Sequence, residues 1–264
     1  CVNIYSTFTC VNTQWSYLLS FWNIWQLLTL ACAWFVLNVC LKHLLVGQSV
    51  MAQKDTARSI LDAAEELFSE RGFAETSLRN ITTKADVNLA AVNYHFGSKK
   101  SLIQAVFARF LNPFVIELDK ALTAYEMAHG TTPADLMSLL RLLSETALKS
   151  GADKPQRLNI FMRLLGLAYS QGQGHLRRFL RLEYGHVFRR YSDLLSQATP
   201  ELSDADRFWR VHFMLGATMF TMSGVDTLTA MAEHDLGTPT STPAVIDQLL
   251  PFLASGMESP AQSS

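Results

Sequence analysis

The spacing of apolar residues after position 50 constrains the fold of this chain more than any other feature. Apolar side chains recur at intervals of three, four and seven residues, which is the period of one helix face. Gly, Pro and Ser interrupt this pattern, and no segment alternates apolar and polar residues as a half-buried strand does. We therefore predict an all-α chain. Its longer helices are expected over residues 55–71, 134–149, 157–170, 175–197, 205–232 and 242–255, with another that begins after Ser98 and is interrupted or restarted at Pro113.

Residues 77–96 predict two short helices joined by a tight turn. Thr76 or Ser77 can cap the first helix and Asn88 the second, because short polar side chains accept hydrogen bonds from amides that the first helical turn leaves free. Asp86 falls between them, where aspartate tolerates a left-handed backbone. Two short helices with such a turn form the helix-turn-helix pattern.

The charge of the chain is nearly balanced but unevenly distributed. The formal net charge is -1 at pH 7, so overall charge does not predict nucleic-acid binding. Residues 76–100, which include the helix-turn-helix, are locally basic, because Arg79, Lys84, Lys99 and Lys100 stand there against a single acidic residue. Such a patch suits a phosphate backbone. An ordinary solvated helix start is the alternative for Lys99 and Lys100.

The same segment matches a known DNA-binding signature. The pattern Ile-x-x-x-Ala-x-Val at residues 81–87, followed by Val-Asn-Tyr-His-Phe-Gly-Ser-Lys-Lys from residue 92, resembles that of TetR-family transcriptional repressors. Asp86 departs from it, because the family usually has glycine there. The resemblance implies a three-helix DNA-binding domain over residues 51–110 and a helical effector-binding and dimerisation domain over residues 111–257.

Outward positions of the second short helix suggest how bases are read. Leu89, Ala90 and Ala91 form an apolar surface that fits thymine methyl groups. Asn93 can pair with an adenine edge, and Arg79 can take a guanine. The complete set of expected DNA contacts, with the phosphate-binding positions implied by the resemblance, is Thr76, Ser77, Arg79, Asn88, Leu89, Ala90, Ala91, Asn93, Tyr94, His95 and Lys99.

Tyr94 and His95 have a second interpretation. Instead of touching phosphates, their rings can form a packed aromatic corner that holds the two neighbouring helices together. The two roles are compatible, because an aromatic ring with a polar edge can be half-buried.

The second half of the chain predicts a soft, apolar interior. Methionine and phenylalanine recur there at helical spacing, which suits a ligand pocket or plain core packing. The expected pocket residues are Phe161, Met162, Leu165, Phe179, Phe188, Phe213, Met219 and Phe220. Basic groups beside these helices can meet a carboxylate, although an exposed basic face explains most of them equally well: Arg163, Arg177, Arg178, Arg189, Arg190 and His212.

Longer segments of this half resemble one group within the family. Asn-Ile-Phe-Met-Arg-Leu-Leu-Gly-Leu-Ala-Tyr-Ser-Gln from residue 159 and Phe-Trp-Arg-Val-His-Phe-Met-Leu-Gly-Ala from residue 208 are similar to the PsrA-type long-chain-fatty-acid-responsive regulators of pseudomonads. The resemblance implies a homodimeric repressor of fatty-acid metabolism genes, released from a palindromic operator by a long-chain fatty acid or acyl-CoA. A different apolar effector, such as a drug or efflux substrate, is the alternative. The expected dimer faces are residues 208–222 and 243–252.

The first 50 residues differ in character from the rest. They hold all four cysteines and four of the five tryptophans, and residues 17–41 are uncharged and long enough to cross a bilayer as a helix. Because Met51 opens a polar arm that leads into an amphipathic helix, we expect residues 1–50 to be an untranslated or spurious leader. A membrane anchor is the main alternative, and a lipoprotein-like Cys1 is a lesser one. Without an anchor, the protein is expected in the bacterial cytoplasm, associated with the nucleoid.

Motifs of catalysis and metal binding are missing from the sequence. It has no Gly-x-Ser-x-Gly elbow, phosphate loop or His-Glu-x-x-His pair, and its histidines lack ligand spacing. We therefore expect neither an enzyme nor a cofactor or metal. Residues 258–264 are expected to form a disordered tail.

Overall fold

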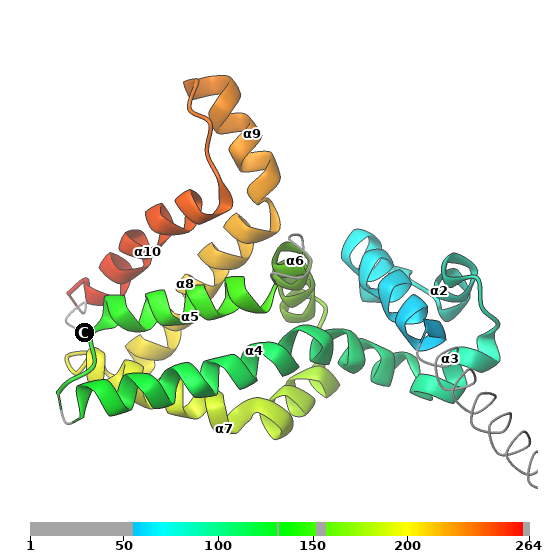
Figure 1. Ribbon diagram of the computed structural model, residues 1–264, viewed down its shortest axis with the longest axis horizontal. Coiled ribbons are helices and arrows are strands. Elements are labelled where there is room, and N and C mark those ends of the chain that lie inside the picture. Colours follow the sequence, from blue (N-terminus) through cyan, green and yellow to red (C-terminus); the bar gives the residue numbers. More distant parts are fainter. Residues whose placement is uncertain (1–54, 131, 152–156, 261–264) are drawn as a thin grey trace, which may run out of the picture. The chain divides into compact units, whose positions relative to one another are not determined.

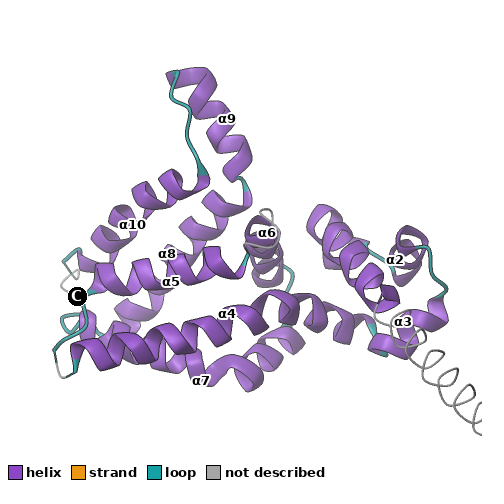
Figure 2. Ribbon diagram, in the orientation of Figure 1, coloured by secondary structure: helices purple, strands orange, loops and turns teal. Residues whose placement is uncertain are grey.

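The computed structural model describes residues 55–130, 132–151 and 157–260, and every regular element in these ranges is a helix (Figure 2). The all-α prediction is confirmed. The predicted leader or anchor at residues 1–50 lies outside the described residues. The helices cover residues 55–75 and then α2 (Leu78–Ala85), α3 (Leu89–Phe96), α4 (Lys99–His129), α5 (Leu136–Ser150), α6 (Arg157–Ser170), α7 (Gly174–Ala198), α8 (Asp204–Ser223), α9 (Val225–Leu236) and α10 (Thr242–Glu258) (Figure 1).

The helix over residues 55–75 packs with α2, α3 and the start of α4 around one small core. Ile60, Phe68, Ile81 and Val92 are completely buried there. Arg109 of α4 ties this group together from outside, because its guanidinium pairs with the carboxylates of Asp62 at 2.6 Å and Glu65 at 3.0 Å. The helix-turn-helix therefore packs against the start of α4, and α4 continues into the second half of the molecule.

Pro113 does not interrupt α4, contrary to the sequence prediction. Proline removes one backbone donor and disfavours the helix interior, yet α4 runs for 31 residues through it. Phe110, Phe114 and Leu118 are buried on both sides of the proline, so tertiary packing offsets the lost hydrogen bond. Tyr184 of α7 adds a hydrogen bond from its hydroxyl to the side-chain oxygen of the neighbouring Asn112, at 2.7 Å.

The length and composition of α4 also raise the question of whether it could cross a membrane. Among the helices of the described residues, α4 alone is long and apolar enough to cross a membrane. Half of its most apolar window is buried inside the protein. It lies between α5 and α7 in the bundle (Figure 1), so its apolar surface is that of a core helix.

The remaining helices form the bundle, in which α6 packs against α8 and α10 against α5 and α8. Most predicted helix boundaries are within a few residues of those observed. The prediction of one continuous helix over residues 205–232 is wrong. This segment breaks at Gly224 into α8 and α9. Arg163 of α6 donates a hydrogen bond to the carbonyl of Ser223 at 3.0 Å and so satisfies one free carbonyl at this break.

The expected disordered tail does not begin at residue 258. Glu258 is the last residue of α10. The guanidinium of Arg210, on α8, donates to the carbonyl oxygens of Met257 at 2.9 Å, Ser259 at 2.5 Å and Pro260 at 3.3 Å. These bonds hold the chain against α8 as far as Pro260, and residues 261–264 lie outside the described part.

Candidate nucleic-acid interface and effector cavity

The helix-turn-helix is built by short-range caps, as the sequence predicts. The hydroxyl of Ser77 accepts from the Asn80 amide at 3.1 Å, and Asn88 accepts from the Ala91 amide at 2.8 Å. Asp86 adopts the left-handed conformation, with φ 53° and ψ 47°. The caps fix where α2 and α3 begin, and Asp86 fixes the turn between them.

α3 presents a surface that differs from an ordinary solvated helix. Leu89 is 41% exposed, and Ala90 and Asn93 are also exposed, whereas Val92 is buried beneath them. Ala91 is half-buried and packs partly against the core, so it presents less surface than Leu89 and Ala90. The side chain of Asn93 makes no hydrogen bond within the described part of the chain. Its amide is therefore available to a base edge.

The four basic residues of this region are not equivalent. Arg79 and Lys100 are exposed and form no hydrogen bond or ion pair with the described residues. Lys84 instead pairs with Glu66 at 2.5 Å, and the Lys99 ammonium lies 3.5 Å from the carbonyl oxygen of Ala74. The local patch that the sequence indicates is therefore partly used to hold α2 and α4 to the first helix.

Thr76 cannot use its side chain as a phosphate contact, so that expectation is corrected. Its side chain is completely buried, and its hydroxyl donates to the carbonyl oxygens of Gly72 at 2.8 Å and Leu67 at 3.1 Å. Thr76 anchors the segment that precedes α2. Ser77, next to it, remains exposed at the start of α2.

The rings of Tyr94 and His95 lie at the surface end of α3. Tyr94 is 72% exposed, which excludes a packed aromatic corner for this ring, while His95 is half-buried. The two rings meet edge to face at 5.1 Å. This arrangement leaves the tyrosine hydroxyl at the surface that also carries Asn93.

The residues expected to line one effector pocket are dispersed. Phe161 is buried and stacks on Phe110 of α4 at 4.1 Å, so it belongs to the core. Phe213 and Phe220 are exposed on α8. Of the remaining expected residues, Phe188 is partly exposed, and three others are half-buried: Leu165, Phe179 and Met219.

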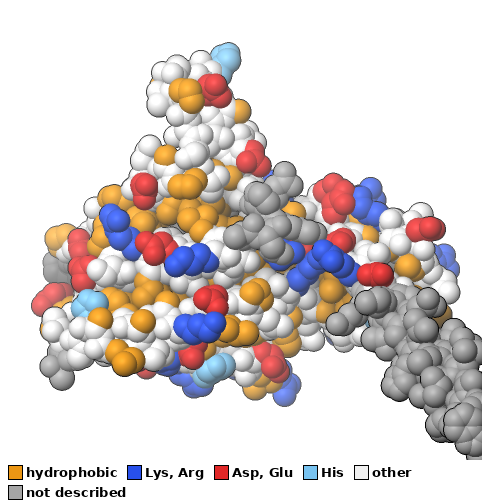
Figure 3. Space-filling view, in the orientation of Figure 1, with side chains coloured by type: hydrophobic (Ala, Val, Ile, Leu, Met, Phe, Trp, Pro, Cys, Tyr) orange, Lys and Arg blue, Asp and Glu red, His pale blue; other side chains and the backbone are white. Residues whose placement is uncertain are grey.

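An apolar cavity lies elsewhere in the bundle and includes only one of the expected residues. It has a volume of about 100 Å³ between α5, α6, α8 and α10, and apolar side chains gather on the molecular face where α10 lies against α5 (Figure 3). Its lining residues are Leu140, Leu143, Ser144, Ala147, Leu158, Met162, Thr218, Met222, Ile246, Leu249, Leu250 and Leu253.

Polar groups in this lining are few. The hydroxyl of Ser144 donates to the carbonyl of Arg141 at 2.9 Å, while that of Thr218 has no hydrogen-bond partner in the described part of the chain. Among the residues with described positions, no charged side chain lines the cavity. Among the arginines expected to meet a carboxylate, Arg190 is occupied instead by Asp119 and Glu126 of α4.

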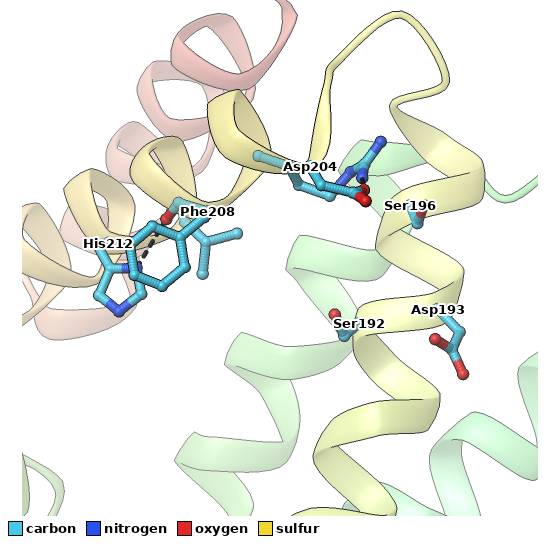
Figure 4. Close-up of a pocket in the computed structure, with 8 residues that line it drawn as sticks. Ser192, Asp193, Ser196, Asp204, Phe208 and His212 are labelled. Atoms are coloured by element: carbon cyan, nitrogen blue, oxygen red, sulfur yellow. Dashed lines mark hydrogen bonds and ion pairs between the residues drawn. The ribbon is translucent and has the colours of Figure 1, made fainter.

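A larger cavity of about 360 Å³, with both polar and apolar lining residues, opens between α7 and α8 (Figure 4). The side chains of Ser192, Asp193 and Ser196 come from α7, and Phe208 and His212 come from α8. His212 uses Nδ1 in a 2.7 Å hydrogen bond with the backbone carbonyl of Phe208. This lining combines charged and polar side chains with the apolar Phe208 and Val211. No group of His, Cys, Asp and Glu side chains that could hold a metal ion occurs among the residues with described positions.

His175, at the start of α7, gives the stability of the protein a predicted pH dependence. Its Nε2 is buried without a hydrogen-bond partner in the described part, and burial, with a smaller contribution from Lys100, lowers its pKa. The unfolded chain then binds a proton more readily than the folded one, so stability falls as pH decreases below about 6.5. We expect His175→Asn to reduce the loss of stability between pH 7 and 5, measured by urea unfolding. His186→Asn, at an exposed position on the same helix, should leave that loss unchanged; an equal effect of both substitutions would contradict this assignment.

Together, the capped helix-turn-helix and the helical bundle that follows it define the class of helix-turn-helix proteins with a helical C-terminal domain. Two family models match the chain and together cover more than half of it. One describes bacterial regulatory proteins of the tetR family and matches residues 60–106; the other describes the tetracyclin repressor-like C-terminal domain and matches residues 141–256. The chain belongs to the TetR family of bacterial transcriptional regulators.

The chain is also similar in sequence to individual helix-turn-helix regulators. A transcriptional repressor of the HTH type from Mycobacterium tuberculosis is 38% identical over 85 residues, which are 32% of this chain and 40% of that protein. The regulator TtgW of Pseudomonas putida is 41% identical over 66 residues, or 25% of this chain and 48% of TtgW. These matches therefore span less than half of either relative.

The fold is also found in solved structures. A TetR-like transcriptional regulator from Rhodococcus sp. RHA1 superposes with a TM-score of 0.50 and 22% identity. The superposition covers 78% of this chain and 97% of the other. At this level of identity, the likeness shows the fold alone.

Proposed function

We propose that the protein is a transcriptional repressor that reads a palindromic operator and acts by binding rather than by catalysis. The observation that carries this proposal is the α3 surface, on which Asn93 is exposed beside Leu89 and Ala90, with Arg79 exposed on α2. Side chains of these types read base edges and thymine methyl groups in the major groove. A repressor of this kind acts in the cytoplasm, at the nucleoid.

The proposed repressor is a homodimer, because one short recognition helix reads too few bases for a specific site. A stripe of exposed side chains supports this part of the proposal. Trp209, Phe213 and Phe220 follow one another along α8, and Phe252 is exposed on the adjacent α10. Gly216 lies within the stripe with open space around it, which lets a partner helix approach closely. The predicted dimer faces 208–222 and 243–252 contain all of these residues.

The proposed effector is a long-chain fatty acid or its acyl-CoA, and the regulated genes are those of fatty-acid metabolism. The apolar lining around Met162 supports an aliphatic chain, and the Thr218 hydroxyl is available to a polar group. The similarity of residues 159–171 and 208–217 to fatty-acid-responsive regulators favours this class of ligand. A drug or efflux substrate is the second candidate, because the described lining residues are all uncharged and so do not by themselves select a carboxylate.

Selection of bound duplexes from a random DNA library tests both the proposed operator binding and the proposed acyl effector. The full chain is expected to enrich a palindrome with half-sites about one helical turn apart. Adding oleic acid or oleoyl-CoA should then release the selected DNA, whereas octane-1,8-diol should not. Absence of an enriched palindrome would exclude sequence-specific repression. A palindrome that resists both acyl compounds would retain the repressor and exclude the acyl effector.

A further inference from the structure

We propose that Gln171 is the positioning residue through which α6 transmits the state of the apolar cavity to the DNA-binding domain. This inference rests on the proposed function, because it describes how an effector would alter operator binding. The route it assigns passes from the bundle directly to the segment before α2. This route differs from one in which α4, as a continuous helix shared by both domains, carries the movement.

The first step is a contact between residues far apart in the chain. The side-chain oxygen of Gln171, just beyond α6, accepts a hydrogen bond from the backbone amide of Phe73 at 3.1 Å. The side-chain nitrogen of Gln171 lies only 2.6 Å from where a Cβ on Gly72 would stand. Gly72 also has φ of +81°, which a side chain would strain. A glycine at this position thus permits both the backbone turn and the approach of Gln171.

The second step is the structure of α6 itself. Leu158 and Met162, near its first turn, line the apolar cavity, and Gln171 follows its last residue. Between these ends, Phe161 stacks on Phe110 at 4.1 Å and meets Phe107 edge to face at 5.7 Å. A helix of this length is a rigid rod of about 20 Å. A ligand that displaces Met162 would tilt the rod on the Phe161 contact and move Gln171.

The third step lies inside the DNA-binding domain. Phe73 is buried with its ring 5.3 Å from that of Phe68, so its peptide cannot move independently of the core. The carbonyl of Gly72 receives the hydroxyl hydrogen bond of the buried Thr76, and Ser77 then caps α2. Movement of Gln171 would therefore shift the first residues of α2, the helix that carries Arg79.

Amide hydrogen exchange at Phe73, measured in the full chain without DNA, tests the contact. We expect Gln171→Ala to accelerate exchange at this amide about fivefold to tenfold, as for the loss of one local hydrogen bond. Gln171→Glu keeps an acceptor oxygen and should retain protection. Gln173→Ala is the matched control, because Gln173 lies in the same loop and makes no side-chain cap hydrogen bond. Unchanged exchange in Gln171→Ala would overturn the proposal.

Transmission from the cavity is tested by filling it without a ligand. Ala147→Leu adds volume to the cavity wall and should change exchange at Phe73 at least threefold, but should have no further effect in a Gln171→Ala background. Ala147→Val makes a smaller addition and serves if the leucine variant does not fold by circular dichroism. An equal effect of the wall substitution in both backgrounds would overturn the proposal. Failure of the DNA selection would reject repression while leaving these exchange results intact.

Discussion

An Arg79→Ala protein is expected to bind its selected operator about 30-fold more weakly or worse and to lose discrimination at one base pair in each half-site. Arg79 is exposed in the first turn of α2, and no described side chain neutralises it. A bidentate contact from arginine to guanine contributes about 1–3 kcal/mol of discrimination, and a dimer would make this contact twice. Fluorescence anisotropy with the operator and its single-base-pair variants measures both effects.

The matched control for this substitution is Arg181→Ala. Arg181 is also exposed but lies on α7 of the bundle, so the change in net charge is the same. It should leave operator affinity within about twofold. If Arg79→Ala instead weakened binding to all sequences alike and reduced the salt dependence, Arg79 would be a phosphate contact rather than a base-reading residue.

A double substitution on the proposed dimer face should have the largest effect on operator binding. Phe213 is 66% exposed and Phe220 is 71% exposed, both on the same stripe of α8. Glutamates at both positions would place unpaired charges in the subunit interface, where burial of a charge is strongly unfavourable. We expect Phe213→Glu with Phe220→Glu to give a folded monomer. Its affinity for the palindrome should fall by more than 100-fold, because two linked half-site contacts become one.

The corresponding control uses an apolar residue on another surface. Leu182 of α7 is 69% exposed, so Leu182→Glu makes the same chemical change at similar exposure. It should remain dimeric by analytical ultracentrifugation and bind the operator normally. A dimer that persists in the doubly substituted α8 protein would show that subunits associate through a different face.

The DNA-binding half could be predicted closely because its signals are local. Ser77, Asn88 and Ser98 each cap a helix through an amide three residues further along the chain. Asp86 carries the turn by its own backbone preference. The same local reasoning failed for Thr76, because its burial depends on how the whole segment folds against residues 67–72.

The effector cavity could not be predicted in the same way. Phe213 and Thr218 are both compatible with a bundle interior, yet the first lies on the exposed stripe and the second lines the cavity. Helical spacing defines the faces of α8 but not which one meets the neighbouring helices. Continuity through Pro113 and the break at Gly224 also depend on packing partners distant in sequence. The sequence thus indicated an apolar interior without locating its free volume.

The contacts of Arg210 have a practical consequence for handling the protein. This residue lies on α8 beside Trp209 and lines a groove with Phe213 and Phe252, while its guanidinium holds the carbonyls of Ser259 and Pro260. The end of α10 is therefore fastened beside the proposed subunit interface. Trimming the chain back to Met257 would remove the carbonyls of Ser259 and Pro260 and leave Arg210 only its bonds to Gly256 and Met257, so it would alter a cation beside the surface whose association an experimenter wishes to measure.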